Sequence, residues 1–365
     1  MAAMMKSWMN KHSRSDDSLL WESQAKRHVS GEYSITIVQG NATLEDQSQV
    51  LSSPSSTLVG VFDGHGGPDA ARFVNAHLFN NMNKLAKERG GVSGEVIRKA
   101  FAATEEQFFR VVKQRVGSKP EIVSVGTCCL VGAICGEDLL VANLGDSRAV
   151  LGRKSLDRDR IVAERLSQDH NVSVEDVRKE VEALHPDDKH IVMFIRGVWR
   201  IKGIIQVSRS LGDAYLKKPE TGYVASVYKT AYHVPIKRPV ISSVPSIVSR
   251  KIKPQDMFLI FASDGLWEHL TDDEAVEIVA THGRSGIGRR LVTAAQKTAA
   301  SKMEMKFSEL KKVEKGVRRN LHDDITVVVV YLDHHQSSHR SLADTVSPAD
   351  IFPLIEGHVY LEGRS

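Results

Sequence analysis

Acidic residues recur in this sequence at the ends of apolar runs and in tight turns. Aspartate is disfavoured inside strands, so its repeated placement at the ends of β-like runs needs an explanation. Turn formation accounts for any one of these positions, because Asp-Gly and Asp-Ser are ordinary turn dipeptides. It accounts poorly for the whole set, which comprises Asp63, Asp146, Asp264, the pair Asp323-Asp324 and the pair Glu45-Asp46.

A cluster of hard oxygen ligands explains these acids better. Carboxylates, backbone carbonyls and water are the ligands that Mg²⁺ and Mn²⁺ prefer. Few histidines and no suitably spaced cysteines accompany the acids, which argues against zinc or copper. Gly64, directly after Asp63, removes the Cβ that would keep a carbonyl away from an ion. His65 follows in the same VFDGHGG stretch and is free to transfer protons there.

The elements that must position these residues are short strands and a few longer helices. Runs rich in Val, Ile or Leu end at Gly, Asp or Asn, as is typical of strands. They are Tyr33–Val38, Leu58–Phe62, Gly126–Ile134, Leu139–Asn143, Ala149–Gly152, Ile204–Val207, Phe258–Ala262 and Ile325–Leu332. Helical patterns cover Pro68–Asn83, Ile97–Val112, Ser173–Leu184 and Gly286 to about Met305. Several strands are consecutive, which favours antiparallel hairpins with helix pairs packed outside, an α+β fold rather than a doubly wound sheet.

The composition is that of a folded protein of mixed charge. The chain has 365 residues, 41% of them hydrophobic, which is enough for one large domain or two ordinary ones with a sizeable core. The formal net charge is only +4 and the signs are interspersed, which argues against a nucleic-acid partner. Cys128, Cys129 and Cys135 lie in one apolar segment, which predicts buried reduced thiols in an intracellular protein. None has an Arg six residues later, as a cysteine-dependent phosphatase would need.

The two ends of the chain differ from its middle. We expect residues 1–19 to be a separate N-terminal segment. If it is helical, one face carries the apolar residues Met1, Met4, Met5, Trp8 and Met9, and Lys6, Lys11 and Arg14 are also present. That pattern fits a helix lying on an anionic membrane surface or a targeting segment, and it fits a plain terminal extension equally well. No apolar run approaches the roughly 18–20 residues of a spanning helix. We expect one domain over residues 20–334 and a polar tail over residues 335–365.

Six motifs occur in the order that is typical of the type 2C metal-dependent protein Ser/Thr phosphatases, and the chain resembles that family from about Leu20 to Asp333. They are VFDGHGG, GTCCLVGAI with LLVANLGDSRAVL, SQDHN, GIIQVSRSLGD, FASDGLWE and DDITVVVVYLD. Segments such as LHPDDKHIV and LKKVEKGVRRNLHDDIT look like the plant clade D branch. The resemblance implies two antiparallel sheets sandwiched between pairs of helices, with the metal site at one end of the sandwich.

The resemblance also implies which residues hold metal. Matched to the family's motifs, Asp63 would bridge two Mg²⁺ or Mn²⁺ ions, and the Gly64 carbonyl would bind one of them. The remaining matches are Asp264 and Asp323 as ligands, Asp46 binding directly or through water with help from Glu45, and Asp146, whose counterparts hold a third, weaker ion in some relatives. Asp323 is preferred to Asp324 because the family's Asp-Asn pair uses its first member.

His65 matches the family's general acid, which protonates the leaving serine or threonine oxygen. Two positions depart from the family's pattern. Asn41 stands where the family usually has an Arg that grips the substrate phosphate, and no Lys or Arg occurs between Arg27 and Arg72. We therefore expect weak binding of small phosphate esters, unless another residue fills that place. Asp324 replaces the family's Asn, which adds a negative charge but keeps the ligand before it.

The leading hypothesis is a protein Ser/Thr phosphatase that hydrolyses phosphoserine and phosphothreonine with water activated by two metal ions. A pseudophosphatase that binds phosphoproteins with little turnover is the alternative, and a metal phosphoesterase for small molecules or nucleic acid is a third class. We expect phosphoprotein substrates and a monomer in the cytoplasm or nucleus, possible peripheral contact with the plasma membrane, and no nucleic-acid partner. Small regulatory proteins are a further expectation from the clade resemblance, and the basic stretch 306–320 suits either docking or a solvated helix face.

Overall fold

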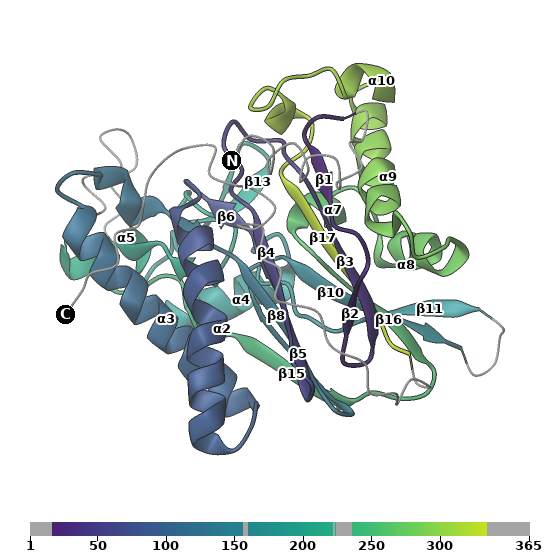
Figure 1. The fold of residues 1–365 in the computed structure, drawn as a ribbon. Helices are drawn as coiled ribbons and strands as arrows, with labels where there is room; N and C mark the ends of the chain where they lie inside the picture. The colour runs from purple at the N-terminus through teal and green to yellow at the C-terminus, as the bar shows by residue number, and fades with distance from the viewer. Residues whose placement is uncertain (1–16, 156–159, 222, 224–235, 334–365) are drawn as a thin grey trace, which may run out of the picture.

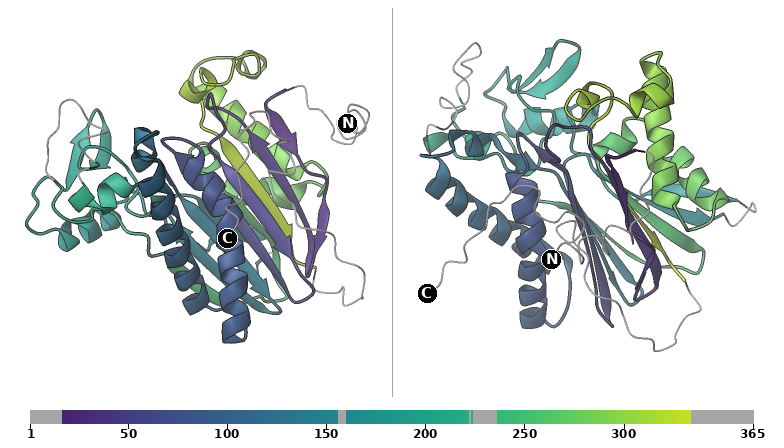
Figure 2. Two further views of the ribbon diagram at one scale, coloured as in Figure 1. Left: turned by 60° about the vertical axis from the view of Figure 1, so that its left-hand side comes forward. Right: turned by 45° about the horizontal axis from the view of Figure 1, so that its top comes forward.

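The computed structural model describes residues 17–155, 160–221, 223 and 236–333. Its elements form four layers, in which two antiparallel sheets face each other and helices cover both outer faces (Figures 1 and 2). The first fourteen residues, on which the expected membrane-surface helix falls, and the polar tail of residues 335–365 lie outside the described residues, so both stay predictions. No helix in the described part of the chain is both long and apolar enough to cross a membrane.

The first sheet has seven strands in the order β1-β3-β17-β16-β10-β11, with β2 also paired to β3. All of its neighbouring strands are antiparallel. The strands are β1 (Leu20–Glu22), β2 (Lys26–His28), β3 (Gly31–Val38), β10 (Arg148–Lys154), β11 (Ile161–Arg165), β16 (Asp256–Ala262) and β17 (Ile325–Tyr331).

The second sheet has five antiparallel strands in the order β15-β9-β8-β5-β4. They are β4 (Gln47–Ser52), β5 (Ser56–Phe62), β8 (Cys129–Cys135), β9 (Asp138–Leu144) and β15 (Ser246–Lys251). The three cysteines on and beside β8 are free thiols, with Cys128 and Cys129 buried and Cys135 half-buried.

Alternation along β17 shows how the layers are built. Every residue of this strand is buried, because both of its faces are covered. Val327 and Val329 pack outward against α8 (Asp272–Thr281) and α9 (Ile287–Lys302), whereas Val328 packs inward against the other sheet. The helix pair α2 (Asp69–Arg89) and α3 (Gly94–Arg115) covers the outer face of the second sheet. The predicted α+β sandwich is confirmed.

Two predicted strands differ in the structure. The run Gly126–Ile134 is interrupted at Cys128, so that β7 (Gly126–Thr127) joins a different sheet from β8. The expected strand Ile204–Val207 is wrong, because this stretch makes only isolated bridges, Ile201 to Ile205 and Asn171 to Val207. Ile204 and Ile205 of this stretch pack in a separate cluster around the end of α3 rather than in a sheet.

Much of that separate cluster comes from the segment between the sandwich strands β11 and β15. This segment contains α4 (Glu175–Leu184), the hairpin β12 (Val192–Ile195) and β13 (Val198–Ile201), α5 (Ala214–Lys217) and the 3-10 turn η2 (Pro219–Thr221). The 3-10 turn η1 (Pro120–Ser124), which follows α3, packs in the same cluster. A small ribbon of β6 (Gly64–His65), β7 and β14 (Leu211–Gly212) connects this part of the molecule to the sandwich. The ribbon matters because it carries His65.

The segment between α9 and β17 is fixed by a buried ion pair. It contains α10 (Phe307–Leu310) and the 3-10 turn η3 (Arg318–Asn320). Arg318 is 1% exposed, and its Nη1 lies 2.7 Å from Asp17 Oδ2. Its Nε and Nη2 donate to the carbonyls of Val313 and Lys311. One guanidinium therefore ties this segment to the start of β1.

We predict that Arg318→Gln destabilises the fold by about 3–5 kcal/mol, because it breaks the buried ion pair with Asp17 by removing one of its charges. Arg319→Gln is the matched control, since the Arg319 side chain is 50% exposed, and it should cost less than about 1 kcal/mol. Urea unfolding followed by tryptophan fluorescence measures both. Equal stability of the two variants would show that the buried pair does not hold this segment.

Candidate metal centre and active site

Strand pairing brings the predicted acids to one end of the sandwich. Asp63 follows β5, whose last residue pairs with the first residue of β4, so Glu45 and Asp46 lie at the same end. Asp264 follows β16, whose last residues pair with the start of β17, directly after Asp323 and Asp324. The two sheets meet here, because the Asp264 amide donates to Asp63 Oδ2 at 3.3 Å.

Asp63 is held by its own backbone. Its carbonyl oxygen accepts hydrogen bonds from the Cys128 amide at 2.8 Å and from Thr127 Oγ1 at 2.9 Å. The next residue must be a glycine, because a Cβ on Gly64 would lie 2.5 Å from the Glu45 carbonyl oxygen. This close approach, and not a left-handed backbone, is what glycine provides at position 64.

Asp264 and Asp46 are the acids whose charges contribute most, after burial, to the raised pKa of Asp63. Asp264 Oδ1 is buried and has no hydrogen-bond partner among the described residues. A buried carboxylate oxygen without a partner is costly, so it indicates a ligand. Asp46 is 1% exposed and accepts a hydrogen bond from Ser263 Oγ at 2.7 Å. Ser263, the residue before Asp264, therefore orients the carboxylate of Asp46.

The acids raise one another's pKa. Burial raises the pKa of Asp63 well above its ordinary value, and the charges of Asp264, Asp46, Asp323 and Asp146 raise it further. Burial likewise raises the pKa of Asp264, with the charges of Asp146 and Asp323 next in size. The site concentrates negative charge where little water can screen it, so cation binding would relieve the repulsion.

Glu45 shows the same effect at the edge of the cluster. Burial, followed by the charges of Asp324 and Asp323, raises its pKa from 4.5 to about 7. A carboxyl group with that pKa exchanges its proton near neutral pH. Any cation that binds beside it must therefore compete with a proton.

These residues fit a hard divalent cation. Within the described residues, no group of three or more His, Cys, Asp or Glu side chains is already arranged to enclose a metal ion. Mg²⁺ does not require such a cage, because it keeps several waters and binds through one or two carboxylates. The unpartnered oxygen of Asp264, the close approach at Gly64 and the all-oxygen donor set fit this ion.

Asp324 has a different role from Asp323, its neighbour. It is 1% exposed, and its Oδ1 accepts the amides of Gly40 and Asn41 at 2.8 and 2.9 Å. Its Oδ2 accepts the amide of Glu45 at 2.8 Å. Three backbone donors thus compensate the extra charge that the sequence shows at this position. Asp324 shapes the loop that carries Asn41 and Glu45, a positioning role that the sequence did not reveal.

Asp323 is the member of the pair whose charge raises the pKa of Asp63 and Asp264. Its Oδ1 accepts a hydrogen bond from Asn41 Nδ2 at 2.7 Å, and its Oδ2 lies 2.7 Å from Arg319 Nη2. Asn41 therefore contacts a predicted metal ligand, so one of its amide donors is already used. Its assignment to the substrate phosphate stays a prediction.

Asp146 lies in the turn after β9. Its Oδ2 accepts a hydrogen bond from Asn171 Nδ2 at 2.6 Å, and the Cys128 thiol lies 3.3 Å from its Oδ1. Asn143 shapes the turn by donating to the carbonyls of Gly145 and Ser147, each at 3.0 Å. Asp146 is close enough to raise the pKa of both Asp63 and Asp264, and its role in holding a third ion stays a prediction.

His65 makes an ion pair that sequence reasoning missed. Its Nε2 lies 2.8 Å from Oδ2 of Asp213, a fully buried residue. Asp213 adopts a left-handed backbone with φ of 51° and accepts a second hydrogen bond from Ser210 Oγ at 2.6 Å. Asp213 ends the SRSLGD stretch. An acid at the end of an apolar run was the sequence signal that could have marked it as a functional residue.

The small ribbon brings these two residues together. In it, His65 pairs with Gly126, and Gly126 pairs with Gly212 on the other side. A Cβ on Gly126 would lie 2.1 Å from Asp213 Oδ2 and 2.4 Å from His65 Nε2. Only glycine leaves room for the ion pair.

The pair sets the charge of the imidazole. Burial opposes protonation of His65, but the charge and hydrogen bond of Asp213 outweigh it, and Asp146 and Glu45 add to them. The net effect is a raised pKa, which favours the protonated ring. A protonated imidazole beside a carboxylate cluster is equipped to act as a general acid.

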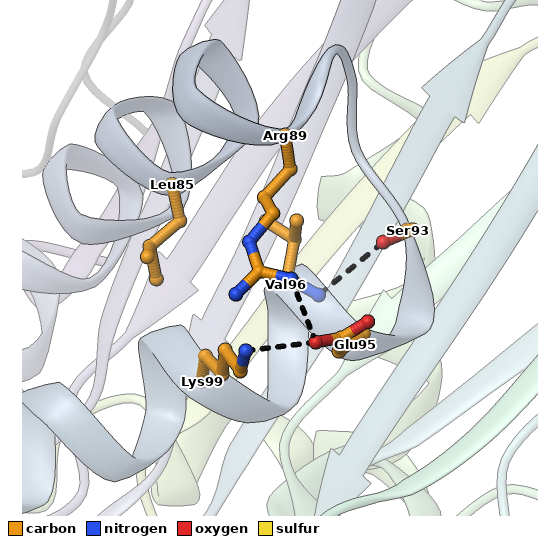
Figure 3. Close-up of a pocket in the computed structure, with 6 residues that line it drawn as sticks. All are labelled: Leu85, Arg89, Ser93, Glu95, Val96 and Lys99. Atoms are coloured by element: carbon orange, nitrogen blue, oxygen red, sulfur yellow. Dashed lines mark hydrogen bonds and ion pairs between the residues drawn. The ribbon is translucent and has the colours of Figure 1, made fainter.

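A pocket between α2 and α3 is not part of this site (Figure 3). It is lined by Leu85, Arg89, Ser93, Glu95, Val96 and Lys99. Glu95 pairs there with Arg89 at 3.0 Å and with Lys99 at 2.7 Å, and all three side chains are well exposed. The pocket lies at the far end of α2 from His65, about 30 Å along the helix axis. Its ion pairs are ordinary surface contacts.

The fold and the site define a class, the metal-dependent protein Ser/Thr phosphatases. A family model described as protein phosphatase 2C matches residues 30–309, well over half of the chain. The chain is 57% identical to "Probable protein phosphatase 2C 63" of Arabidopsis thaliana over 348 residues, covering 93% of this chain and 92% of that protein. It is 56% identical to "Probable protein phosphatase 2C 78" of Oryza sativa subsp. japonica, covering 92% and 88%.

Solved structures agree on the fold. "Crystal structure of serine-threonine phosphatase 2C from Toxoplasma gondii" superposes with a TM-score of 0.58 at 16% identity, covering 86% of this chain and 98% of that one. "Structure of a C.elegans sex determining protein" gives 0.59 at 20% identity, covering 82% and 64%. The chain belongs to the protein phosphatase 2C family and is a protein Ser/Thr phosphatase. Its placement in clade D stays a prediction.

We predict that His65→Gln lowers kcat on phosphoserine peptides by about 10²–10⁴-fold, the usual range for loss of a general acid. Asp213→Asn should lower it by about 10- to 100-fold, because the ring keeps a hydrogen-bond acceptor but loses a charge. Both losses should be smaller on an aryl phosphate, whose leaving group needs little protonation. Steady-state kinetics on the two substrates measure this, and equal losses on both would assign the pair another role.

We predict that Mg²⁺ raises the melting temperature more at pH 8 than at pH 6. Glu45 binds its proton up to about pH 7 when folded, against about 4.5 when unfolded, so the metal-free fold loses stability as the pH rises through this window. Mg²⁺ must displace such protons, so it binds more strongly at the higher pH. Thermal unfolding with and without Mg²⁺ measures the shift, and Glu45→Gln should reduce its pH dependence. The same shift at both pH values would contradict this account.

Proposed function

We propose that this chain hydrolyses phosphoserine and phosphothreonine in proteins at the carboxylate cluster, with two divalent ions bound there. Asp63, the Gly64 carbonyl, Asp264 and Asp323 would hold the ions, and Asp46 would contribute directly or through water. Asp146 would help to hold a third, weaker ion. The observation that carries the proposal is the mutual approach of acids around Asp63, together with Oδ1 of Asp264, which is buried and has no partner among the described residues.

Divalent ions bound there would lower the pKa of a water molecule and offset charge on the phosphoryl oxygens. The chain's own residues supply the remaining requirements. His65 Nε2 is engaged by Asp213, which leaves Nδ1 as the ring nitrogen that can donate a proton to the leaving oxygen. Asp213 holds the ring in place and favours its protonated form. No cysteine nucleophile is needed, which agrees with the raised pKa that burial gives the thiols of Cys128 and Cys129.

A phosphoprotein-binding role with little turnover is less well supported. Such a protein would have no need for a His–Asp ion pair beside an acidic cluster, and this chain keeps both. Small regulatory proteins, peripheral membrane contact, a monomeric state and an intracellular location stay predictions from the sequence.

We predict that phosphate release from a phosphoserine peptide requires Mn²⁺ or Mg²⁺ and stops when a chelator is added. Asp63→Asn should lose at least about 10²-fold in kcat even at saturating Mn²⁺, because it removes the charge of the central ligand while nearly keeping its size. Asp273→Asn on the exposed first turn of α8 is the matched control and should retain normal activity. Near-normal turnover by Asp63→Asn would exclude the two-ion arrangement.

A further inference from the structure

The Arg that usually binds the substrate phosphate in the family is replaced by Asn41 in this chain. Asn41 carries no charge, and its Nδ2 already donates to Asp323 Oδ1 at 2.7 Å. The sequence around it offers no replacement, since no Lys or Arg occurs between Arg27 and Arg72. A phosphate monoester carries up to two negative charges beside an acidic cluster, so a cation must come from elsewhere in the fold.

Arg319 lies where such a cation is needed. Its Nη2 is 2.7 Å from Asp323 Oδ2, so Arg319 and Asn41 contact the two oxygens of one carboxylate. The Arg319 side chain is 50% exposed, which gives a ligand access to it. A guanidinium has five N–H donors in a planar fork, so contact with Asp323 along one edge is compatible with a phosphate along another.

The segment that carries Arg319 is packed on the loop that carries Asn41. The Gly316 amide donates to the Gly40 carbonyl at 2.8 Å. Gly316 has a φ of +85°, and a Cβ there would lie 3.1 Å from the Cβ of Ala42. The position of Arg319 beside Asn41 is therefore set by backbone contacts as well as by its own ion pair.

The two adjacent arginines are used differently. Arg318 is buried against Asp17 and two carbonyl groups, where it can reach no ligand. Fixing Arg318 inward directs the next side chain outward, toward Asp323. A surface arginine that only solubilises the protein needs neither this anchor nor a partner in the acidic cluster.

We propose that Arg319 binds the phosphoryl group of the substrate, in place of the Arg that the family has at position 41. This inference rests on the proposed function, because it assumes that the phosphate binds at the carboxylate cluster. Arg319 is then a substrate-binding residue that reaches the site from the opposite end of the sequence.

Inorganic phosphate as an inhibitor and an aryl phosphate as substrate test the proposal at saturating Mn²⁺. Arg319→Gln should raise the phosphate inhibition constant and the KM by about 10- to 150-fold, the range for a lost hydrogen bond to a charged group. It should change kcat by less than about threefold. Lys315→Gln, an exposed cation of the same segment, is the matched control and should change neither constant.

A second variant gives a sharper test. Asn41→Arg in the Arg319→Gln background should restore both constants, because it returns a guanidinium to the same carboxylate. Isothermal titration of phosphate into the Mg²⁺-loaded protein gives a readout that does not depend on turnover. It should show the same loss in Arg319→Gln and the same recovery in the double variant.

Unchanged phosphate inhibition and titration in Arg319→Gln would overturn the proposal. So would a variant that needs more Mn²⁺ but binds phosphate normally once saturated, because Arg319 would then only position Asp323. Failure of the proposed function looks different, since the unmodified protein would then show no metal-dependent phosphate release at all.

Discussion

Repulsion among buried and half-buried carboxylates is the constraint on which this structure depends. Asp46, Asp63, Asp264 and Asp323 each have a pKa raised first by burial, and each is raised further by the charge of at least one other acid. A fold that places like charges together in a poorly hydrated site loses stability by doing so. The arrangement is sustained by the packed sandwich and is useful only if a cation offsets the charge.

The rest of the fold serves to hold these charges in place. The sheets bring strand ends together, and the valine-rich core between them keeps those ends aligned. The Asp324 carboxylate accepts hydrogen bonds from three backbone amides and so shapes the loop that carries Glu45. Arg318 fixes the segment before β17 from the opposite side. Each of these residues is charged and buried, yet each is neutralised locally, in contrast to the acids of the cluster.

The sequence predicted much of this arrangement because its signals are local. Asp63, Gly64 and His65 are consecutive, and the burial of β17 on both faces follows from an unbroken run of apolar residues. Strands such as β4 were missed, since Gln47–Ser52 is largely polar and obtains its place only by pairing with β5. Conversely, the run Ile204–Val207 predicted a strand, but Ile204 and Ile205 pack in the cluster around α3, and the run makes only isolated bridges.

Residues that act through distant partners could not be predicted in this way. Asp213 meets His65 only because the ribbon of β6, β7 and β14 forms and Gly126 leaves space. Asp324 was recognised as a departure from the family's pattern, but its three amide donors belong to a loop at the other end of the chain. Arg319 is one of several basic residues in its segment, and only its contact with Asp323 distinguishes it.

Anomalous diffraction from crystals soaked in Mn²⁺ tests the central claim most directly, because it locates the ions without reference to activity. The account predicts two strong peaks that share Asp63 as a ligand, one of them beside the Gly64 carbonyl and the other beside Asp264 and Asp323. A single peak remote from Asp63, or none in the carboxylate cluster at saturating Mn²⁺, would contradict it.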